Sequence, residues 1–233
     1  MTFEEIMVFL EEHGTEQVRK IFTNHGIPDP KFGVKVADLK IVQKKVKKNY
    51  ELSMQLYETG NYDAKYLAGL IADEKQMTKD DLQHWMATCG CESIATNTAA
   101  WIAAESDYGL ELAREWILSD DESVAAGGYS TYVSLIALTP NEDLDIPEIE
   151  GLLDNIVEII HSEREEVKYQ MNGFVIAAGG YIPALAEKAK RYGAKIGKVS
   201  VDMGNTACKV PLIVPYIEKM EARGVKKKKK ARC

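Results

Sequence analysis

Residues 146–160, IPEIEGLLDNIVEII, give the clearest indication of fold class in this chain of 233 residues. Their apolar side chains recur at helical spacing, at Ile146, Ile149, Leu152, Leu153, Ile156, Val157 and Ile160. Because an α-helix turns once every 3.6 residues, this spacing places them in one buried stripe. The same spacing recurs along nearly the whole chain, and no segment alternates with the period of two that a strand shows. The sequence therefore predicts an all-α protein.

Residues that start and stop helices divide the chain into short units. Thr2 with Glu5, and Thr78 with Asp81, fit capping boxes, in which each side chain accepts a hydrogen bond from a backbone N–H that the helix leaves open. Glycines expected to end helices in the left-handed conformation, and prolines suited to a first turn, are Gly14, Gly26, Gly224, Pro147 and Pro183. These signals predict helices near 3–13, 15–24, 36–48, 51–58, 63–71, 79–88, 93–105, 108–118, 122–137, 146–160, 164–178, 183–192 and 212–223.

The connections between these helices are short, mostly two to six residues, so successive helices are expected to be antiparallel neighbours. Stacked helical hairpins form an α-α superhelix, a solenoid of the HEAT or armadillo kind, whose inner surface is a long concave groove. We expect a single HEAT-like domain over residues 1–224 and a flexible basic tail over 225–233, since five consecutive lysines repel one another.

Two runs of small residues, Ala125–Tyr129 and Ala177–Tyr181, both read AAGGY. They fall at the start of one predicted helix and at the end of another, so they do not mark a repeat. Small side chains allow close approach of a neighbouring helix or of another molecule, and of these two readings the sequence favours helix packing.

The positive charges are concentrated in three segments, although the chain as a whole carries a net charge of −7. Residues 31–48 hold seven lysines and one acid, Asp38; residues 188–198 hold five basic residues and no acid; and the tail holds Lys226 to Lys230 and Arg232. Removing the six positive charges of the tail leaves a body at −13. Such segregation favours a nucleic-acid partner, whereas the alternative is that the lysines are solvated surface that keeps the protein soluble. Segments 36–48 and 188–198 are expected near opposite ends of the groove.

Other classes of function have little support in the sequence. No apolar run approaches the roughly 20 residues of a membrane helix, and the N-terminus does not resemble a secretory signal, so we expect a cytoplasmic protein with no membrane association. Cys89, Cys91, Cys208 and Cys233 are expected to be reduced thiols. The four histidines are scattered singly, so we predict no metal and no cofactor.

Phe32-Gly33-Val34-Lys35, followed by Val36-Ala37-Asp38-Leu39, resembles the opening motif of the AlkD-like DNA alkylation repair family, which consists of HEAT-repeat DNA glycosylase-like proteins. Further similarity lies in Trp116–Ser119, in Lys168–Phe174 and in Cys208–Pro211, so the resemblance spans most of the chain. It implies a protein that wraps duplex DNA in a concave basic groove, some family members removing positively charged alkylated purines.

The catalytic members of this family are similar in having a Trp four residues before an Asp, a later Arg pair and a later Trp. The matching positions here are Ile94, Thr98 or Ala99, Ala125 with Ala126, and Phe174. A preorganised carboxylate that stabilises the cationic transition state is worth about 3–4 kcal/mol. The resemblance therefore implies DNA binding linked to alkylation repair, with weak or no base excision; the alternatives are an active alkylpurine DNA glycosylase and a non-catalytic protein-interaction solenoid.

Trp101 and Glu105 repeat the Trp-to-acid spacing seven residues later, on nearly the same helix face. They are the only candidates for a catalytic pair, against the alternative that Trp101 lies in the core and Glu105 is solvated. The residues expected to contact duplex or structured DNA are Lys35, Lys40, Lys44, Lys168, Tyr169, Phe174, Lys209, Lys226, Lys227, Lys228, Lys229 and Lys230. We expect a monomer, and the acidic segments 105–122 and 142–158 are a possible face for a protein partner.

Overall fold

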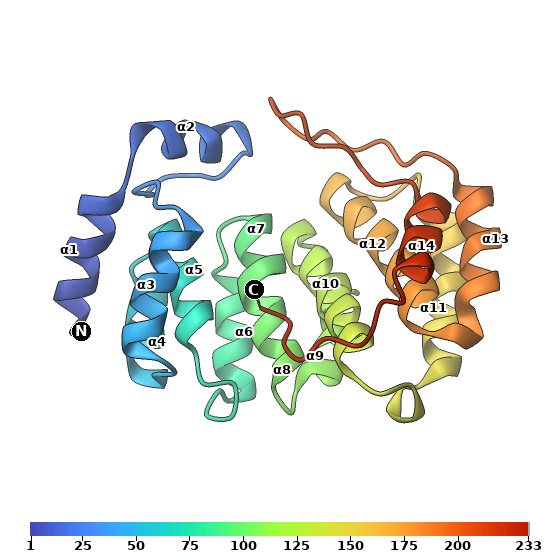
Figure 1. Cartoon of the computed structure of the whole chain (residues 1–233), viewed down its shortest axis with the longest axis horizontal. Coiled ribbons are helices and arrows are strands. Elements are labelled where there is room, and N and C mark those ends of the chain that lie inside the picture. Colours follow the sequence, from blue (N-terminus) through green and yellow to red (C-terminus); the bar gives the residue numbers. More distant parts are fainter. Residues whose placement is uncertain (233) are drawn as a thin grey trace.

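The computed structural model describes residues 1–232, and within that range it is helical with no strand. Figure 1 shows the helices arranged as a curved double layer. The α-helices are α1 (Phe3–His13), α2 (Glu16–Asn24), α3 (Val36–Val46), α4 (Tyr50–Glu58), α5 (Tyr62–Ile71), α6 (Lys79–Ala87), α7 (Glu92–Ile94), α8 (Ala100–Glu105), α9 (Gly109–Trp116), α10 (Glu122–Leu138), α11 (Ile146–Ile159), α12 (Glu165–Tyr181), α13 (Ala186–Ile196) and α14 (Ile213–Ala222). A π-helical turn, η1 (Ala95–Ala99), joins α7 to α8, and the short 3-10 turns are η2 (Asn141–Asp143) and η3 (Pro183–Leu185).

The helix boundaries follow the capping signals closely. Both predicted capping boxes are confirmed, because Thr2 and Thr78 each accept from the N–H three residues on and the acids at those positions accept in return. Gly26 and Gly224 have the positive φ expected of a helix end. The expectation that Gly14 adopts the left-handed conformation is wrong, because its φ is −67°. Glycine is needed there for space, since a Cβ would lie 2.4 Å from the carbonyl oxygen of Phe32.

One row of helices packs side by side through the middle of the molecule. α3 contacts α5, α5 contacts η1, η1 contacts α10, α10 contacts α12, and α12 contacts α14. The helices α4, α6, α9, α11 and α13 form a second layer, and each packs against a member of this row. The all-α superhelix of HEAT-like hairpins that the sequence predicts is therefore confirmed.

The core consists of two contiguous apolar clusters. The first runs from Ile6 in α1 to Trp116 in α9, and the second from Ala113 in α9 to Met220 in α14. They meet where α10 packs against α8 and α9. The AAGGY runs lie at close helix contacts: in α10, a Cβ at Gly128 would be 2.6 Å from the backbone nitrogen of Ile117, and in α12, one at Gly179 would be 2.5 Å from Ile217 of α14. Helix packing, the favoured reading of these runs, is confirmed.

A buried carboxylate holds the turn that precedes α3. Asp63, with no exposed surface, accepts hydrogen bonds from the backbone nitrogens of Phe32 at 2.7 Å, Gly33 at 3.0 Å and Val34 at 2.8 Å. Burial raises the pKa of Asp63, and the three N–H donors oppose that rise. Gly33 has φ +84°, and a Cβ there would lie 2.7 Å from the carbonyl oxygen of Thr15. This turn sets the direction in which α3 leaves.

A charged bridge joins α9, α10 and α11 and should make stability depend on pH. Arg114 donates two hydrogen bonds to Glu148, at 2.7 and 2.6 Å, and Tyr132 donates a third at 2.7 Å. The bond from Arg114 lowers the pKa of Glu148, although burial opposes it. Because the folded pKa lies below the unfolded one, the contribution is complete above the ordinary value of 4.5 and is lost as pH falls through the folded pKa.

Glu148→Gln is therefore expected to lower the free energy of unfolding at neutral pH by about 1 kcal/mol, a small value because Arg114 is half exposed. Chemical unfolding at pH 7 and at successively lower pH measures it. The two proteins should converge in acid, and a difference that grows below pH 4 would contradict this account.

Candidate nucleic-acid interface

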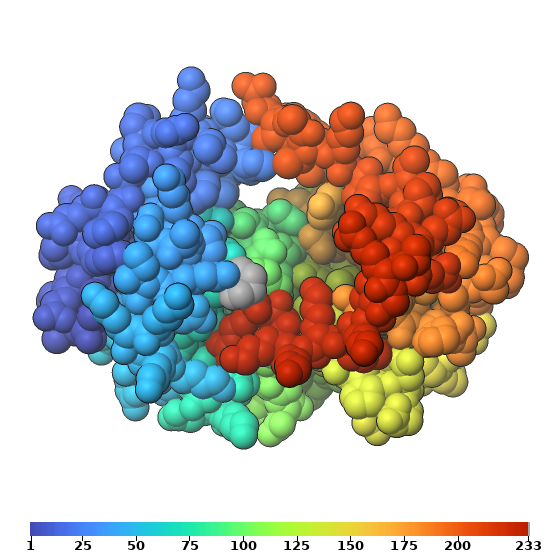
Figure 2. Space-filling model, in the orientation of Figure 1, coloured from blue at the N-terminus to red at the C-terminus, as the bar shows by residue number. Residues whose placement is uncertain are grey.

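The molecule is hollowed on one face. Figure 2 shows α3 on one side of the hollow, α14 on the other, and residues of the central helices recessed between them. The segment between α13 and α14 reaches across to α2, since a Cβ at Gly204 would lie 2.6 Å from the carbonyl oxygen of Asn24. The tail, up to residue 232, crosses the hollow below that segment. The hollow is thus bordered by the basic helix α3, the segment that carries Lys209, and the basic tail.

The three basic segments do not share one location. The segment 31–48 includes α3, beside the hollow, as the sequence predicts. α13, which carries most of the segment 188–198, lies at the other end of the stack from α3, but it belongs to the second layer (Figure 1). There Lys188 pairs with Glu150 and Asp154 of α11, at 2.8 and 2.6 Å, and Lys195 pairs with Glu158 at 2.6 Å. These cations join two outer helices.

The tail lies against the ends of helices in the structure, and the flexibility that the sequence predicts for it stays a prediction. Lys227 Nζ donates to the carbonyl oxygen of Ile136 at 2.6 Å, and the backbone nitrogen of Lys228 donates to that of Ala137 at 2.7 Å. Both acceptors lie in the last turn of α10, where carbonyl groups lack a partner within the helix and carry the negative end of its dipole. Burial lowers the pKa of Lys227. Lysine repulsion is thus offset by helix ends that accept the donors. Residue 233 lies outside the described range.

The predicted DNA contacts differ in accessibility. Lys35, Lys44, Lys209, Lys226 and Lys228 to Lys230 are exposed, and Lys40 and Lys227 are partly exposed. Lys168 is mostly buried and pairs with Glu165, and burial raises the pKa of the half-buried Tyr169. The expectation that Phe174 contacts DNA is wrong. Its side chain has no exposed surface and lies edge-on to Tyr129 and Tyr132, so it is a core residue.

The positions that match the catalytic residues of the family are closed. Ile94, Thr98 and Ala99 are buried at the π-helical turn η1, and Ala125 and Ala126 are buried in α10. A π turn inserts one residue into a helix and shifts the face on which later side chains lie. Here it buries Thr98, whose methyl group would be 2.7 Å from a Cβ added at Gly69. No ionisable side chain occupies these positions.

The weaker candidates, Trp101 and Glu105, both lie in α8. Trp101 is partly exposed and meets the ring of Tyr66 edge-on, with ring centroids 6.1 Å apart. Glu105, whose side chain is only 9% exposed, accepts from the backbone nitrogens of Ala231 at 2.7 Å and Arg232 at 3.2 Å. Its carboxylate is thus occupied by the tail. Whether the pair takes part in chemistry stays a prediction.

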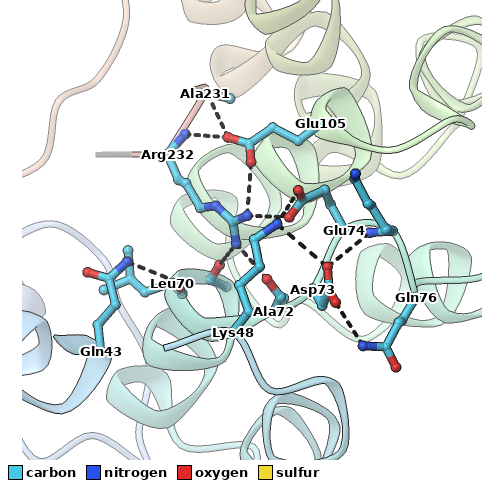
Figure 3. Close-up of polar contacts among 12 residues, drawn as sticks. Gln43, Lys48, Leu70, Ala72, Asp73, Glu74, Gln76, Glu105, Ala231 and Arg232 are labelled. Atoms are coloured by element: carbon cyan, nitrogen blue, oxygen red, sulfur yellow. Dashed lines mark hydrogen bonds and ion pairs between the residues drawn. The ribbon is translucent and has the colours of Figure 1, made fainter. Parts of the chain in front are cut away.

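Sequence reasoning did not single out Arg232, which the structure places in a buried cluster of charges. Its guanidinium is 4% exposed and pairs with Glu74 and Glu105 (Figure 3). The partners are more than 120 residues away along the chain, and no pattern in the letters joins them. The one signal was its place at the end of a run of cations.

The described residues offer neither a metal site nor a membrane-spanning helix. Within residues 1–232, no group of three or more His, Cys, Asp or Glu side chains is arranged to hold a metal ion. None of the helices in that range is both long and apolar enough to cross a membrane.

Comparisons with known proteins agree with the geometry. A family model described as DNA alkylation repair enzyme matches residues 6–190. The chain is 36% identical to protein Lmo0209 of Listeria monocytogenes and 35% identical to protein Lin0241 of Listeria innocua, each over 228 residues that cover 96% of this chain and 99% of the relative. A solved structure, from a new family of proteins related to the HEAT-like repeat DNA glycosylases with affinity for branched DNA structures, covers 100% of both chains with a TM-score of 0.91 and 33% identity. With its HEAT-like superhelix, its basic border and this match, the chain belongs to the DNA alkylation repair enzyme family.

Proposed function

We propose that this protein binds structured DNA, branched DNA included, in its hollow face through phosphate contacts, and that it releases alkylated bases weakly or not at all. The solved relative of 33% identity has affinity for branched DNA, and the whole of both chains superimposes. Phosphate contacts from lysines fix DNA without reading its sequence, which suits recognition of a shape rather than of a base.

One observation carries this proposal: the hollow keeps a basic border while the excision positions are closed. Thr98 and Ala99, at the position of the family's acid, are buried, and Ala125 and Ala126 take the place of the Arg pair. Without a carboxylate near the sugar, the cationic transition state of base release lacks its main stabiliser. Binding needs only the cations at the border.

Two alternatives remain as outcomes of the test. An active alkylpurine glycosylase would use Trp101 and Glu105, and it would have to release Glu105 from the tail first. A protein-interaction solenoid would use the acidic segments 105–122 and 142–158, and it would not retain DNA at about 0.1 M salt.

The test combines a binding assay with a base-release assay. Fluorescence anisotropy with linear duplex and with a four-way junction should show binding, tighter for the junction. Single-turnover assays on duplex that contains 3- or 7-methylpurine should show no release above background. Release by the wild type that Glu105→Gln abolishes would support the glycosylase instead, and absence of retention on any DNA would support the interaction solenoid.

The salt dependence of binding tests which lysines touch phosphate. Replacing Lys40 and Lys44 of α3 together with alanine is expected to reduce the slope of log affinity against log salt by about 2, since each lost phosphate contact removes roughly one released counterion. Lys195→Ala, in the outer helix α13, is the matched control and should leave the slope unchanged. Equal effects of the two variants would contradict a DNA site in the hollow. A cytoplasmic location, a monomeric state and a single domain over 1–224 stay predictions.

A further inference from the structure

An open cavity of about 290 Å³ lies between α3 and the tail, and most of its lining is cationic. Lys47 and Lys48 approach from the end of α3, and Lys230 and Arg232 from the tail, with Gln43 and Leu70 completing the wall. The two groups of cations are about 180 residues apart along the chain, so the cavity exists in this form only while the tail is in place.

Arg232 holds the tail in that place. One guanidinium nitrogen donates to the carbonyl oxygens of Gly69 at 3.1 Å and Ala72 at 2.8 Å, at the C-terminal end of α5, and the other pairs with Glu74 at 2.5 Å and Glu105 at 3.0 Å (Figure 3). These are the acceptors that a planar guanidinium fits best: two carboxylates and two helix-end carbonyl groups. Because the guanidinium of Arg232 is buried and makes all four contacts, the surrounding residues form a specific binding site for it.

The same contacts offset negative charge beside the cavity. Asp73, Glu74 and Glu105 do not line the cavity, but their carboxylates contact two cations that do, Lys48 and Arg232 (Figure 3). Lys48 pairs with Asp73 at 3.5 Å and also with Glu74, which leaves Glu105 with Arg232 as its one cationic partner among residues 1–232. Without the tail, these three carboxylates pair with Lys48 alone among the described residues. With the tail, Arg232 adds a second cation, so the net charge of the group rises from −2 to −1.

The charges of two lysines that line the cavity, Lys47 and Lys230, are available to a ligand. Neither Lys47 nor Lys230 forms an ion pair within the part of the chain that the structure describes. Lys47 is also the one non-glycine residue described with a positive φ, at +61°. A lysine held in a conformation that favours glycine is strained, and such strain persists where the surroundings or a function require that residue.

We infer that this cavity is a phosphate-binding site shared between the end of α3 and the tail, and that Arg232 is the latch that assembles it. The inference rests on the proposed function, because the phosphate it takes belongs to the backbone of bound DNA. The tail lysines therefore contribute from fixed positions and not as a mobile polycation.

The test compares two single-charge changes in the same tail. Arg232→Ala keeps all five tail lysines but opens the latch, and Lys229→Ala, which does not line the cavity, removes one charge and leaves the latch closed. Anisotropy with a four-way junction at about 0.1 M salt is expected to show about tenfold weaker binding for Arg232→Ala and about twofold for Lys229→Ala. A chain that ends at residue 225 should lose about as much as Arg232→Ala.

Equal effects of the two changes would overturn the latch, and tighter binding by Arg232→Ala would show instead that the tail obstructs the hollow. If the wild type binds no DNA, the proposed function fails by itself. In that case inorganic phosphate titrated at constant ionic strength, followed by amide NMR, still tests the cavity: resonances of Lys47 and Lys230 should shift in the wild type and not in Arg232→Ala.

Lys47→Gly separates a ligand role from a structural one. Glycine relieves the strained φ, so the melting temperature should rise by about 2–4 °C, while junction binding weakens because a cation of the cavity is lost. A variant that is more stable and binds DNA as well as the wild type would contradict the assignment of Lys47 to the site.

Discussion

Asp63→Ala is expected to lower the free energy of unfolding by about 3–5 kcal/mol and the melting temperature by about 10 °C. The carboxylate is the acceptor for the backbone nitrogens of Phe32, Gly33 and Val34, and alanine would leave those donors unpaired in a largely buried turn. Each unpaired buried donor costs about 1–3 kcal/mol. Urea unfolding followed by circular dichroism measures the change.

Two further variants test whether the loss of stability in Asp63→Ala comes from the hydrogen bonds of the carboxylate. Asp63→Asn keeps an acceptor oxygen but turns an NH₂ group toward one of the backbone donors, so its loss should fall between those of the wild type and alanine. Asp38→Ala removes an acid from the first turn of α3 without disturbing this turn, and should cost less than about 1 kcal/mol. If Asp63→Ala were no worse than Asp38→Ala, the carboxylate would not hold the turn.

The Asp63 turn separates the part of the fold that could be predicted from sequence from the part that could not. Helix periodicity and capping act over three or four residues. The capping box of Thr2 and Glu5, and the helix that contains the apolar stripe from Ile146 to Ile160, could therefore be predicted from the local sequence alone. The Asp63 carboxylate acts over about 30 residues, and nothing in its neighbourhood distinguishes it from the surface acids of other helices. Local order was predictable, and the contacts that join hairpins were not.

The basic segments show the same limit for the site. Charge in the sequence indicates where cations lie along the chain but not which carboxylates face them. Lys188 and Lys195 pair with α11, whereas the lysines of α3 border the hollow. The tail was expected to be flexible because its lysines repel one another, and the acceptors that its side chains and backbone contact lie at the ends of α5 and α10. Only the assembled layers place those helix ends beside it.

The π turn at η1 is another feature that the apolar periodicity of the sequence could not predict. The apolar pattern is continuous over 93–105, so the sequence predicts one α-helix, and the structure has α7, η1 and α8 in succession. Ile94 and Thr98 both face the core across this turn. The closure of the excision site is therefore a property of the packing as well as of the residue types, which has a measurable consequence.

Restoring an acid at the family's catalytic position is expected to destabilise the protein rather than to activate it. Thr98 is 1% exposed, and its hydroxyl oxygen has no hydrogen-bond partner among the described residues. Thr98→Asp would bury a carboxylate at a position where the present hydroxyl finds no hydrogen-bond donor, at a cost of several kcal/mol, and the pKa of the new acid would rise until it is neutral. We expect a melting temperature lower by about 10 °C and no release of alkylated purines.

Thr98→Val is the matched control, because valine has nearly the same shape and lacks the unpaired hydroxyl. Removing an unsatisfied buried group is neutral or stabilising, so its melting temperature should equal or exceed that of the wild type. Junction binding should be unchanged by Thr98→Val, since the residue lies in the core and not at the basic border. Base release by a stable Thr98→Asp variant would show that the position is open to DNA, and the reading of this protein as a binder whose excision site is closed would be wrong.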